Sequence, residues 1–470
     1  MVIIKEIELM PDIILTHGYF LDEDPKEKEI MRPYPPLGIL YISGYLKEQG
    51  FYPEVFDSTF STRNTFESKL LSSECQTLGV YTTHMTRRSV ITQIKVAKQM
   101  GYTIIVGGPD SAGYPQQYLD HGADFVVIGE GEATLAELLP QLSAINYSEK
   151  DLKRIHGLVF RAPDGKVIET PMRDYLHIDS LPWPDRESID IEQYLEAWDS
   201  HHGETSLNMI NSRGCRFQCR FCSHSVFGNI ERRRAPEKSA DEVEWIVKQY
   251  NPDQLWFSDD VFTMDHDWLF KFSDELKRRN VNISFEAISR ADRMQDDQIV
   301  KELADMGCRR IWIGSESGSD RILRAMRRGV TSDQIIRAVK LSKQYGIETG
   351  IFLMWGYEGE TLEDIELTIE HVIKSQPDIF LTTTVHPIRN TPYYYDVIEK
   401  TIHPESWVDS SDKDIGILGR KHPDFYKAID QWLKNAVKAA RSKDDNPQEA
   451  ARYEATAQEA KKKVQVLINE

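Results

Sequence analysis

Residues 207–222 read Leu-Asn-Met-Ile-Asn-Ser-Arg-Gly-Cys-Arg-Phe-Gln-Cys-Arg-Phe-Cys. The short apolar segment 207–210 leads directly into three cysteines, Cys215, Cys219 and Cys222, at the spacing C-x3-C-x2-C. Thiolates at this spacing can reach three corners of one iron–sulfur cube, and the sequence has no fourth cysteine nearby. A 4Fe–4S cluster held in this way keeps one iron free for an outside ligand. The stretch therefore predicts an open cluster site directly after a strand.

A zinc site is the main alternative for the same cysteines. A structural zinc ion takes four ligands, and His224 could supply the fourth. Scattered core thiols are a further alternative. The remaining cysteines, Cys75 and Cys308, form no motif, and we expect them to be buried structural thiols.

The composition of the chain bounds its class and its partners. Its 470 residues predict two or three domains, and its net charge of −18 argues against a broad surface for nucleic acid or anionic membranes. No apolar run approaches the length of a membrane span, and the N-terminus lacks the pattern of a secretory signal. Five cysteines with one tight cluster favour a reducing compartment over a disulfide framework. We expect a cytoplasmic protein with no nucleic-acid partner and no stable membrane insertion.

Residues 1–145 are expected to form one domain in which short apolar strands alternate with helices. This alternation predicts a doubly wound, Rossmann-like parallel sheet. Ligands of such sheets sit beyond the carboxyl ends of the strands, and two of those ends are Gly107-Gly108-Pro109 and Gly129-Glu130-Gly131. The expected strands span 12–16, 52–56, 77–82, 103–109 and 125–129, with helices at 37–49, at 89–100 and from 133.

Three further regions follow along the chain. Residues 146–205 are expected to be a connector with a hairpin around Pro163-Asp-Gly-Lys166. Residues 206–400 contain six strand–helix units, which predict a partial TIM-type (β/α)6 barrel with its active site at the carboxyl ends of the strands. Residues 401–470 predict a small helical C-terminal region that packs on the core, with a partner-binding or lid role as the alternative. The barrel strands are expected at 207–210, 254–258, 282–288, 309–313, 348–354 and 378–384.

Taken in order, these motifs resemble those of the radical S-adenosylmethionine enzymes, in the large class with an N-terminal cobalamin-binding-type domain. The resemblance covers residues 10–400 and rests most firmly on the cysteine spacing. It implies a 4Fe–4S cluster on Cys215, Cys219 and Cys222, whose open iron binds S-adenosylmethionine. Phe221 matches the aromatic position that lies beside the adenine in this family, although packing around the cluster explains it as well.

The resemblance also implies contacts to the methionyl group of S-adenosylmethionine. Asp259 and Asp260 follow the second barrel strand, and Asp259 is the preferred partner of the ammonium group. A helix N-cap at Asp260 or Thr263 is the alternative. Arg290 follows the third strand, where similar proteins pair a basic residue with the methionyl carboxylate. A surface ion pair is the alternative for Arg290.

Two later strand ends carry the remaining implied contacts. Glu316 and Ser317 lie in Gly314-Ser-Glu-Ser-Gly318 after the fourth strand, where Glu316 would accept from the ribose hydroxyls or orient the substrate. The alternative is a turn before a helix capped by Ser319. Gly356 belongs to the fifth-strand motif, whose backbone runs along the adenine in similar proteins.

The N-terminal resemblance implies a second cofactor. Gly107, Gly108, Gly129 and Glu130 are the implied cobalamin contacts, because glycines let the backbone approach a cofactor closely. The Asp-x-His-x-x-Gly motif that would supply a histidine ligand to cobalt is absent from the sequence. Many members of the class bind cobalamin without such a ligand, and others keep the domain without the cofactor. We therefore expect cobalamin bound without a histidine ligand.

Together the parts imply a radical enzyme. A one-electron reductant such as a flavodoxin or ferredoxin would reduce the cluster, and cleavage of S-adenosylmethionine would yield a 5′-deoxyadenosyl radical. Cobalamin would direct that radical chemistry to methylation of an unactivated carbon, with a radical cyclase, mutase or oxidase and a non-catalytic sensor as alternatives. The substrate is expected to be a small or lipid-like molecule. Arg232, Arg233 and Arg234 either line a basic mouth for an anionic substrate or begin a solvated helix.

Overall fold

The computed structural model describes residues 10–143, 148–223 and 226–468. The described residues form two compact units. The first contains the described residues up to 214, with 226–234 and 405–411; the second contains the rest. The four-part division of the chain at residues 145, 205 and 400 stays a prediction.

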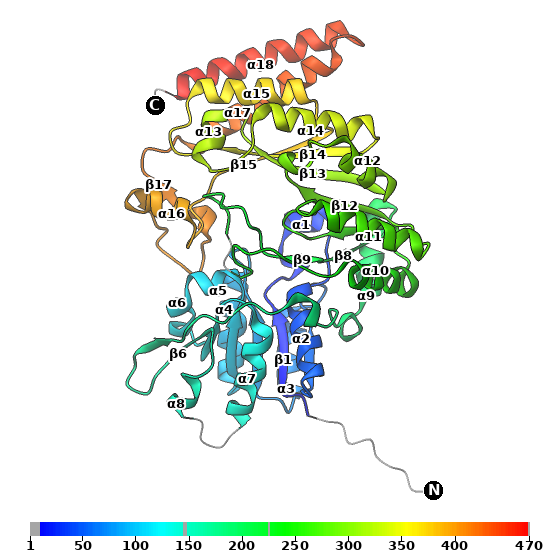
Figure 1. The fold of residues 1–470 in the computed structure, drawn as a ribbon. Coiled ribbons are helices and arrows are strands. Elements are labelled where there is room, and N and C mark those ends of the chain that lie inside the picture. Colours follow the sequence, from blue (N-terminus) through cyan, green and yellow to red (C-terminus); the bar gives the residue numbers. More distant parts are fainter. Residues whose placement is uncertain (1–9, 144–147, 224–225, 469–470) are drawn as a thin grey trace. The chain divides into compact units, whose positions relative to one another are not determined.

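The first unit is built on a seven-stranded sheet whose strand order is β2-β1-β3-β4-β5-β6-β7 (Figure 1). Its first five strands are parallel, as the alternation of strands and helices predicts. The strand order reverses between β1 and β3, and ligands of such sheets bind beyond the carboxyl ends at this kind of switch point. The strands are β1 (Ile13–His17), β2 (Pro53–Phe56), β3 (Thr77–Tyr81), β4 (Thr103–Gly107), β5 (Phe125–Val127), β6 (Leu158–Arg161) and β7 (Val167–Glu169).

Both faces of the parallel strands are buried, which explains their continuous apolar runs. Alternate residues enter different cores because successive side chains of a strand point to opposite faces. Ile14 and Ile104 belong to one apolar cluster, whereas Ile13 and Ile105 belong to the other. The helices of this unit are α1 (Pro25–Ile30), α2 (Leu37–Glu48), α3 (Arg63–Ser72), α4 (Arg87–Gln99), α5 (Pro109–Gly113), α6 (Pro115–Asp120), α7 (Gly131–Ser143), α8 (Glu149–Leu152) and α9 (Ile191–His202).

The hairpin expected in the connector is present, and it extends the first sheet. Strands β6 and β7 pair antiparallel with each other, and β6 pairs antiparallel with β5. In this arrangement Val159 packs in one apolar cluster of the sheet and Phe160 in the other, so both side chains are buried. This burial explains why the hairpin pairs with β5. The sheet is therefore mixed, with two antiparallel strands added to the predicted parallel ones.

The second sheet has six strands in the order β15-β14-β13-β12-β11-β8, which confirms the partial barrel. All the pairs from β11 to β15 are parallel. The strands are β8 (Ser206–Met209), β11 (Gln254–Phe257), β12 (Ser284–Ser289), β13 (Cys308–Glu316), β14 (Glu348–Trp355) and β15 (Ile379–Thr384). The connecting helices are α10 (Pro236–Tyr250), α11 (His266–Arg278), α12 (Asp297–Asp305), α13 (Asp320–Ala325), α14 (Ser332–Gln344) and α15 (Leu362–Ser375).

Local sequence signals set the helix starts that shape the strand ends. Thr331 with Gln334 and Thr361 with Asp364 form capping boxes, in which each side chain bonds the backbone N–H of the other. These boxes begin α14 and α15. The loop between α13 and α14 and the turn after β14 are thereby held in place.

The C-terminal helices pack on the core, as their periodicity predicts. In α17 (Pro423–Ser442), Phe425, Ile429 and Trp432 are buried. Figure 1 shows α17 and α18 (Pro447–Leu467) lying against each other, and α17 also contacts α15. The short helix α16 (Pro392–Val397) precedes them. No helix in the described part of the chain combines the length and the apolar character needed to cross a membrane.

Candidate functional site

The three motif cysteines lie on the loop between the two strands of a small ladder. Strands β9 (Ser212–Arg213) and β10 (Arg232–Arg233) pair antiparallel and form the base of this loop. Cys215 and Cys219 are buried, and Cys222 is half-buried. Cys215 packs against Val261 and Met264, which follow β11. The loop thus gathers its thiols at the carboxyl end of the second sheet.

The electrostatics of the thiols show that they influence one another. Burial, followed by Asp260, Cys219 and Cys215, raises the pKa of Cys222 to about 12. Burial, with Asp260 and Cys219, also raises the pKa of Cys215. Cys215 and Cys222 therefore favour the protonated thiol, and a bound metal centre would have to displace those protons.

The donor set at the loop bears on the choice between a cluster and a single zinc ion. Among the residues that the structure describes, no three His, Cys, Asp or Glu side chains converge tightly enough to hold one metal ion. A cluster needs the thiols around one cube at a wider spacing, because each thiolate binds a different iron. His224, the fourth ligand of the zinc alternative, lies outside the described residues. The donor set that is present, three thiols on one loop, fits the three-cysteine cluster.

Two buried arginines flank the middle cysteine. The Nη1 atoms of Arg290 and Arg328 each lie 3.7 Å from Cys219 Sγ. Arg290 directly follows β12, as predicted, and only 2% of it is exposed, so the alternative of a surface ion pair does not apply. Its contact with a methionyl carboxylate stays a prediction. Arg328 was missed from the sequence, because the run Met326-Arg-Arg-Gly329 reads as an ordinary basic loop.

The two adjacent aspartates after β11 have different environments. Asp259 is buried, whereas Asp260 is exposed and acts electrostatically on Cys215 and Cys222. The N-cap alternative is wrong for Asp260 and Thr263, because α11 begins at His266 and is capped by Asp265. Asp265 accepts a hydrogen bond from the backbone N–H of Trp268 at 3.0 Å. The contact of either aspartate with a methionyl ammonium group stays a prediction.

Glu316 ends β13 in a strained conformation. Its φ of 61° is left-handed, and the pairing of β13 with β14 shifts register between Gly314 and Glu316. Its Oε1 lies 3.3 Å from Arg328 Nε. Burial raises the pKa of Glu316, with Arg328 opposing. A non-glycine residue held in this region signals a functional constraint.

Ser317 and Ser319 have structural partners. Ser317 Oγ lies 3.1 Å from Thr368 Oγ1, and the side chain of Ser319 caps α13. The capped-turn alternative is therefore correct for Ser319. A direct cofactor contact by Ser317 stays a prediction, and its hydroxyl is already bonded inside the protein.

Phe221 and Gly356 both lie in the second unit. Phe221 packs against an apolar cluster that includes Tyr357 and Tyr393. Gly356 follows β14 with a φ of 75° and donates its N–H to Glu360 Oε2 at 2.7 Å. The other oxygen of Glu360 is buried and has no hydrogen-bond partner among the described residues. Gly356 thus follows the strand that the sequence predicts, and the adenine contacts of Phe221 and Gly356 stay predictions.

Glu360 makes the stability of the second unit depend on pH. Burial raises its pKa from 4.5 to about 7, so the folded state binds a proton that the unfolded state has already lost at pH 6. The free energy of unfolding is expected to fall as the pH rises from about 4.5 to beyond 7. The change is on the order of 3 kcal/mol. Urea denaturation across this pH range should show the free energy of unfolding of the wild type falling as the pH rises. In Glu360→Gln the contribution of this carboxyl group to the fall should be absent. Equal slopes for both proteins would contradict the assignment.

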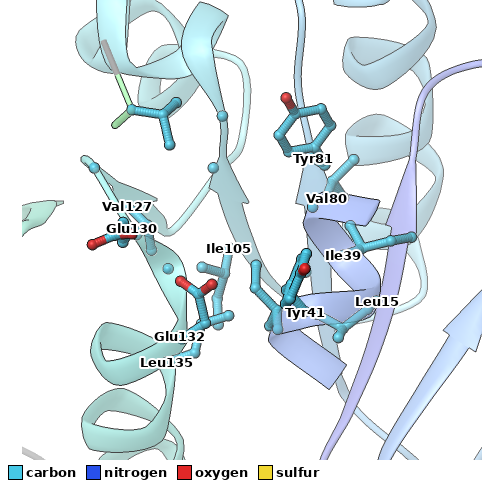
Figure 2. Close-up of a pocket in the computed structure, with 18 of the residues that line it drawn as sticks. Leu15, Ile39, Tyr41, Val80, Tyr81, Ile105, Val127, Glu130, Glu132 and Leu135 are labelled. Carbon is cyan, nitrogen blue, oxygen red and sulfur yellow. The ribbon is translucent and has the colours of Figure 1, made fainter. Parts of the chain in front are cut away.

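The four predicted cobalamin residues meet in one cavity of the first unit. Gly107, Gly108, Gly129 and Glu130 all line a space of about 200 Å³ at the carboxyl ends of β3, β4 and β5. Figure 2 shows that most of its wall is apolar, with Tyr81 and Glu130 near the strand ends. The volume admits an edge or a side arm of a corrinoid. Its other apolar lining residues include Leu15, Ile39, Tyr41, Val80, Ile105, Val127 and Leu135.

Gly108 cannot be replaced without moving the backbone. Its φ is 109°, and a Cβ there would lie 2.4 Å from the carbonyl oxygen of Thr82. Gly108→Ala is expected to lower the free energy of unfolding by at least about 2 kcal/mol and to abolish cobalamin binding. Gly165→Ala is the matched control, because Gly165 also has a positive φ of 86°, a Cβ there would meet nothing within 4 Å, and the residue does not line the cavity. Cobalamin titration followed by absorption would contradict the expectation if both variants bound equally well.

Glu130 is part of a buried ionic cluster that the sequence did not reveal. Arg213 Nη1 donates to Glu130 Oε1 at 2.7 Å, and Arg213 Nη2 lies 2.7 Å from Glu132 Oε1. Arg232 Nη1 donates to Glu130 Oε2 at 2.8 Å. Burial opposes the charge on Arg213, but Glu132 and Glu130 raise its pKa. Glu130 therefore forms part of the cavity wall. Arg213 and Arg232 hold it in place, because its oxygens already accept hydrogen bonds from them.

The basic mouth suggested by three consecutive arginines is not formed by free cations. Arg232 pairs with Glu130, and Arg233 Nε lies 2.9 Å from Glu231 Oε1. Arg234 is 2% exposed. The ion pairs of Arg232 and Arg233 and the burial of Arg234 argue against the basic mouth. The three arginines do not begin a solvated helix either, because α10 begins only at Pro236.

Comparison with known families matches both predicted parts of the chain. Residues 209–372 match the Radical SAM superfamily, and residues 29–139 match the B12 binding domain. The first range contains the cysteine loop and the strand ends from β11 to β14. The second contains the strand ends that line the cavity.

Several curated proteins are similar to this chain over most of its length. An uncharacterized methyltransferase, PH0819 of Pyrococcus horikoshii, is 30% identical over 368 residues, which cover 76% of this chain and 77% of the relative. The anaerobic magnesium-protoporphyrin IX monomethyl ester cyclase of Rubrivivax gelatinosus is 26% identical over 75% of this chain and 64% of its own length.

Solved structures share the fold. The cobalamin-dependent S-adenosylmethionine radical enzyme OxsB, solved with aqua-cobalamin and S-adenosylmethionine, superposes with a TM-score of 0.75 at 18% identity, covering 95% of this chain and 70% of OxsB. The radical S-adenosylmethionine methyltransferase TsrM from Kitasatospora setae superposes with a TM-score of 0.67 at 18% identity, covering 82% and 76%. With these matches, this chain belongs to the radical SAM superfamily, in the class that carries a B12 binding domain.

Proposed function

We propose that this protein is a cobalamin-dependent radical S-adenosylmethionine methyltransferase that acts on an unactivated carbon. The observation that carries the proposal is the presence of two cofactor sites in one chain. Three thiols lie on one loop in the second unit, and a glycine-lined cavity lies at a sheet's carboxyl edge in the first. The match to a relative named as a methyltransferase supports the same reading.

The cysteine loop has the parts that a cluster requires. Cys215, Cys219 and Cys222 would hold the 4Fe–4S cluster, which supplies the electron that cleaves S-adenosylmethionine. Three thiolates bring negative charge into a buried place, and Arg290 and Arg328 supply positive charge beside Cys219. This donor set supports a negatively charged iron–sulfur group.

The neighbouring strand ends would bind and orient S-adenosylmethionine. Asp259 or Asp260 would receive the methionyl ammonium, and Arg290 the carboxylate. Glu316 would accept from the ribose hydroxyls, with Ser317 behind it, and Gly356 and Phe221 would border the adenine. These groups position the cofactor and exclude water, while the cofactors supply the difficult chemistry.

In the first unit, Gly107, Gly108, Gly129 and Glu130 would hold an edge of cobalamin. Cobalamin, when bound, carries the methyl group that is transferred. The positive φ values of Gly108 and Gly129 let the backbone form the wall where a side chain would intrude. Their geometry supports close approach of a large planar group.

The proposal also includes the surroundings of the enzyme. A flavodoxin or ferredoxin would deliver the electron, and the substrate would be a small or lipid-like molecule. All five cysteines, each within the described residues, are free thiols, which supports a reducing cytoplasm. The acidic net charge of −18 supports the expectation that nucleic acid is not a partner.

The methyl-transfer step can be tested without knowing the substrate. The anaerobically purified protein is incubated with cobalamin, a strong one-electron reductant and S-adenosylmethionine carrying a deuterated methyl group. We expect S-adenosylhomocysteine to form and the label to appear in the cobalamin fraction, together with 5′-deoxyadenosine. Formation of 5′-deoxyadenosine without any label in cobalamin would contradict methyl transfer.

A radical cyclase, mutase or oxidase on the same fold is the second candidate. Several similar proteins are named as anaerobic magnesium-protoporphyrin IX monomethyl ester cyclases, at 26% identity. Such an enzyme would form 5′-deoxyadenosine without consuming the methyl group. The labelled-methyl experiment therefore separates the two candidates.

A further inference from the structure

The sulfur of Cys219 has a different environment from those of the other two cysteines. Two guanidinium groups reach it, with the Nη1 atoms of Arg290 and Arg328 both at 3.7 Å. That distance is within reach of an N–H···S hydrogen bond. Only 2% of Arg290 and 6% of Arg328 is exposed, so neither charge is screened by bulk water.

Arg328 is held in place by contacts of its Nε and Nη2 atoms, which leave Nη1 to face the sulfur. Its Nη2 donates to the carbonyl oxygen of Gly314 at 2.8 Å, and its Nε lies 3.3 Å from Glu316 Oε1. A Cβ at residue 314 would lie 2.3 Å from Nη2, so only glycine leaves room for the guanidinium. The end of β13 is therefore shaped to receive this side chain.

Arg290 is held just as firmly. Its Nε donates to Asp292 at 2.9 Å, and its Nη2 donates to the carbonyl oxygen of Arg328 at 2.6 Å. The guanidinium carbon lies 3.5 Å from the centre of the Phe217 ring. The two arginines are thus linked to each other and to the cysteine loop.

The charges around the three sulfurs are unequally distributed. Asp260 acts on Cys215 and Cys222, and its effect on their pKa values is larger than the opposing effects of Arg290 on Cys215 and of Arg328 on Cys222. Near Cys219 the cations are Arg290 and Arg328, each with one carboxylate partner, Asp292 and Glu316. The cations are the groups that touch the sulfur, and the carboxylates lie behind them.

We propose that Arg328, together with Arg290, is a positioning residue that raises the reduction potential of the cluster through the Cys219 sulfur. The inference rests on the proposed function, because it requires the three cysteines to hold a 4Fe–4S cluster. Reduction adds one electron from an external one-electron donor, so the reduced cluster is more negative by one charge. Fixed cations and N–H···S bonds stabilise that state more than the oxidised one.

The test is the midpoint potential of the reconstituted cluster, measured by an anaerobic redox titration followed by electron paramagnetic resonance. In Arg328→Gln we expect the equilibrium constant for reduction to fall at least about tenfold, which corresponds to about 59 mV toward more negative potential. Arg290→Gln should shift it in the same direction, and Arg328→Lys, which keeps the charge, should shift it less. Arg327→Gln is the matched control, because it removes the neighbouring exposed arginine and should leave the potential unchanged.

Removing Arg328 alone leaves Glu316 buried without its cation, which could disturb the fold. The second variant to measure is therefore the double substitution Arg328→Gln/Glu316→Gln. It should also lower the potential, because the N–H···S bond is lost. Equal potentials for the wild type and for Arg328→Gln or the double variant, at full iron content, would overturn the inference and leave the cluster proposal intact. A wild type that binds no cluster overturns the proposed function, and the inference with it.

Discussion

Replacing Cys222 with alanine is expected to remove the iron–sulfur cluster and with it all radical chemistry. The wild type should hold about four irons per chain after anaerobic reconstitution, whereas two thiolates are too few to keep a cube with one open corner. Iron and sulfide should fall to background, and 5′-deoxyadenosine should no longer form. Colorimetric iron and sulfide assays, with product analysis by mass spectrometry, measure both effects.

Cys308→Ala is the matched control for that substitution. Cys308 is also buried, and burial raises its pKa well above its usual value, but its Sγ faces the carbonyl oxygen of Arg310 in β13. Loss of this thiol should reduce stability slightly and leave the iron content unchanged. A Cys222→Ala variant that retains four irons, or a Cys308→Ala variant that loses them, would contradict the site.

The second large effect is expected from Arg213→Met. This substitution leaves Glu132 buried without its cation and takes one of two arginines from Glu130, while the methionine keeps most of the volume. Removing one member of a buried ion pair typically costs 3–5 kcal/mol, because the remaining charge is uncompensated. We expect a loss on the order of 4 kcal/mol in the free energy of unfolding. Because Arg213 lines the cavity, cobalamin should also bind more weakly.

Arg161→Met provides the comparison for the same chemical change at the surface. Arg161 pairs with Asp120, and 38% and 50% of these side chains are exposed. Exposed pairs contribute about 1 kcal/mol or less, so this variant should unfold almost as the wild type does. Urea denaturation of both variants measures the difference. Equal losses in the free energy of unfolding for the two variants would contradict a stabilising role of the buried Glu130–Arg213 cluster.

The features predicted from the sequence are those that depend on local spacing. The C-x3-C-x2-C loop needs only a strand before it, and the alternation of strands and helices determines the parallel order of each sheet. Gly107, Gly108 and Gly129 were found because strand ends in such sheets meet at one edge. The cavity that they line follows from topology alone.

The missed features depend on contacts between residues far apart in the chain. Arg328 is 109 residues from Cys219, so no local pattern marks it as a neighbour of the cluster. Arg213 and Glu130 are 83 residues apart, and each looks unremarkable in its own segment. The ring of Trp407 packs edge-on against Tyr118 in the first unit, although it follows the barrel strands in sequence.

The sequence also left open which polar residue begins a helix. Asp260, Thr263 and Asp265 lie within six residues, and each is a good N-cap. The choice of Asp265 places the apolar stripe of α11, including Leu269 and Phe272, on the core. Packing of that stripe therefore decides the cap, and leaves the two aspartates after β11 outside the helix.

The central claim is that one chain uses a 4Fe–4S cluster and cobalamin together. The most direct measurement is the iron, sulfide and cobalt content of protein purified without oxygen from cells supplied with cobalamin, together with its absorption spectrum. The account predicts about four irons and about one cobalt per chain. Four irons with no cobalt, even after reconstitution with cobalamin, would contradict the methyltransferase, and a protein that binds no iron would contradict the radical enzyme altogether.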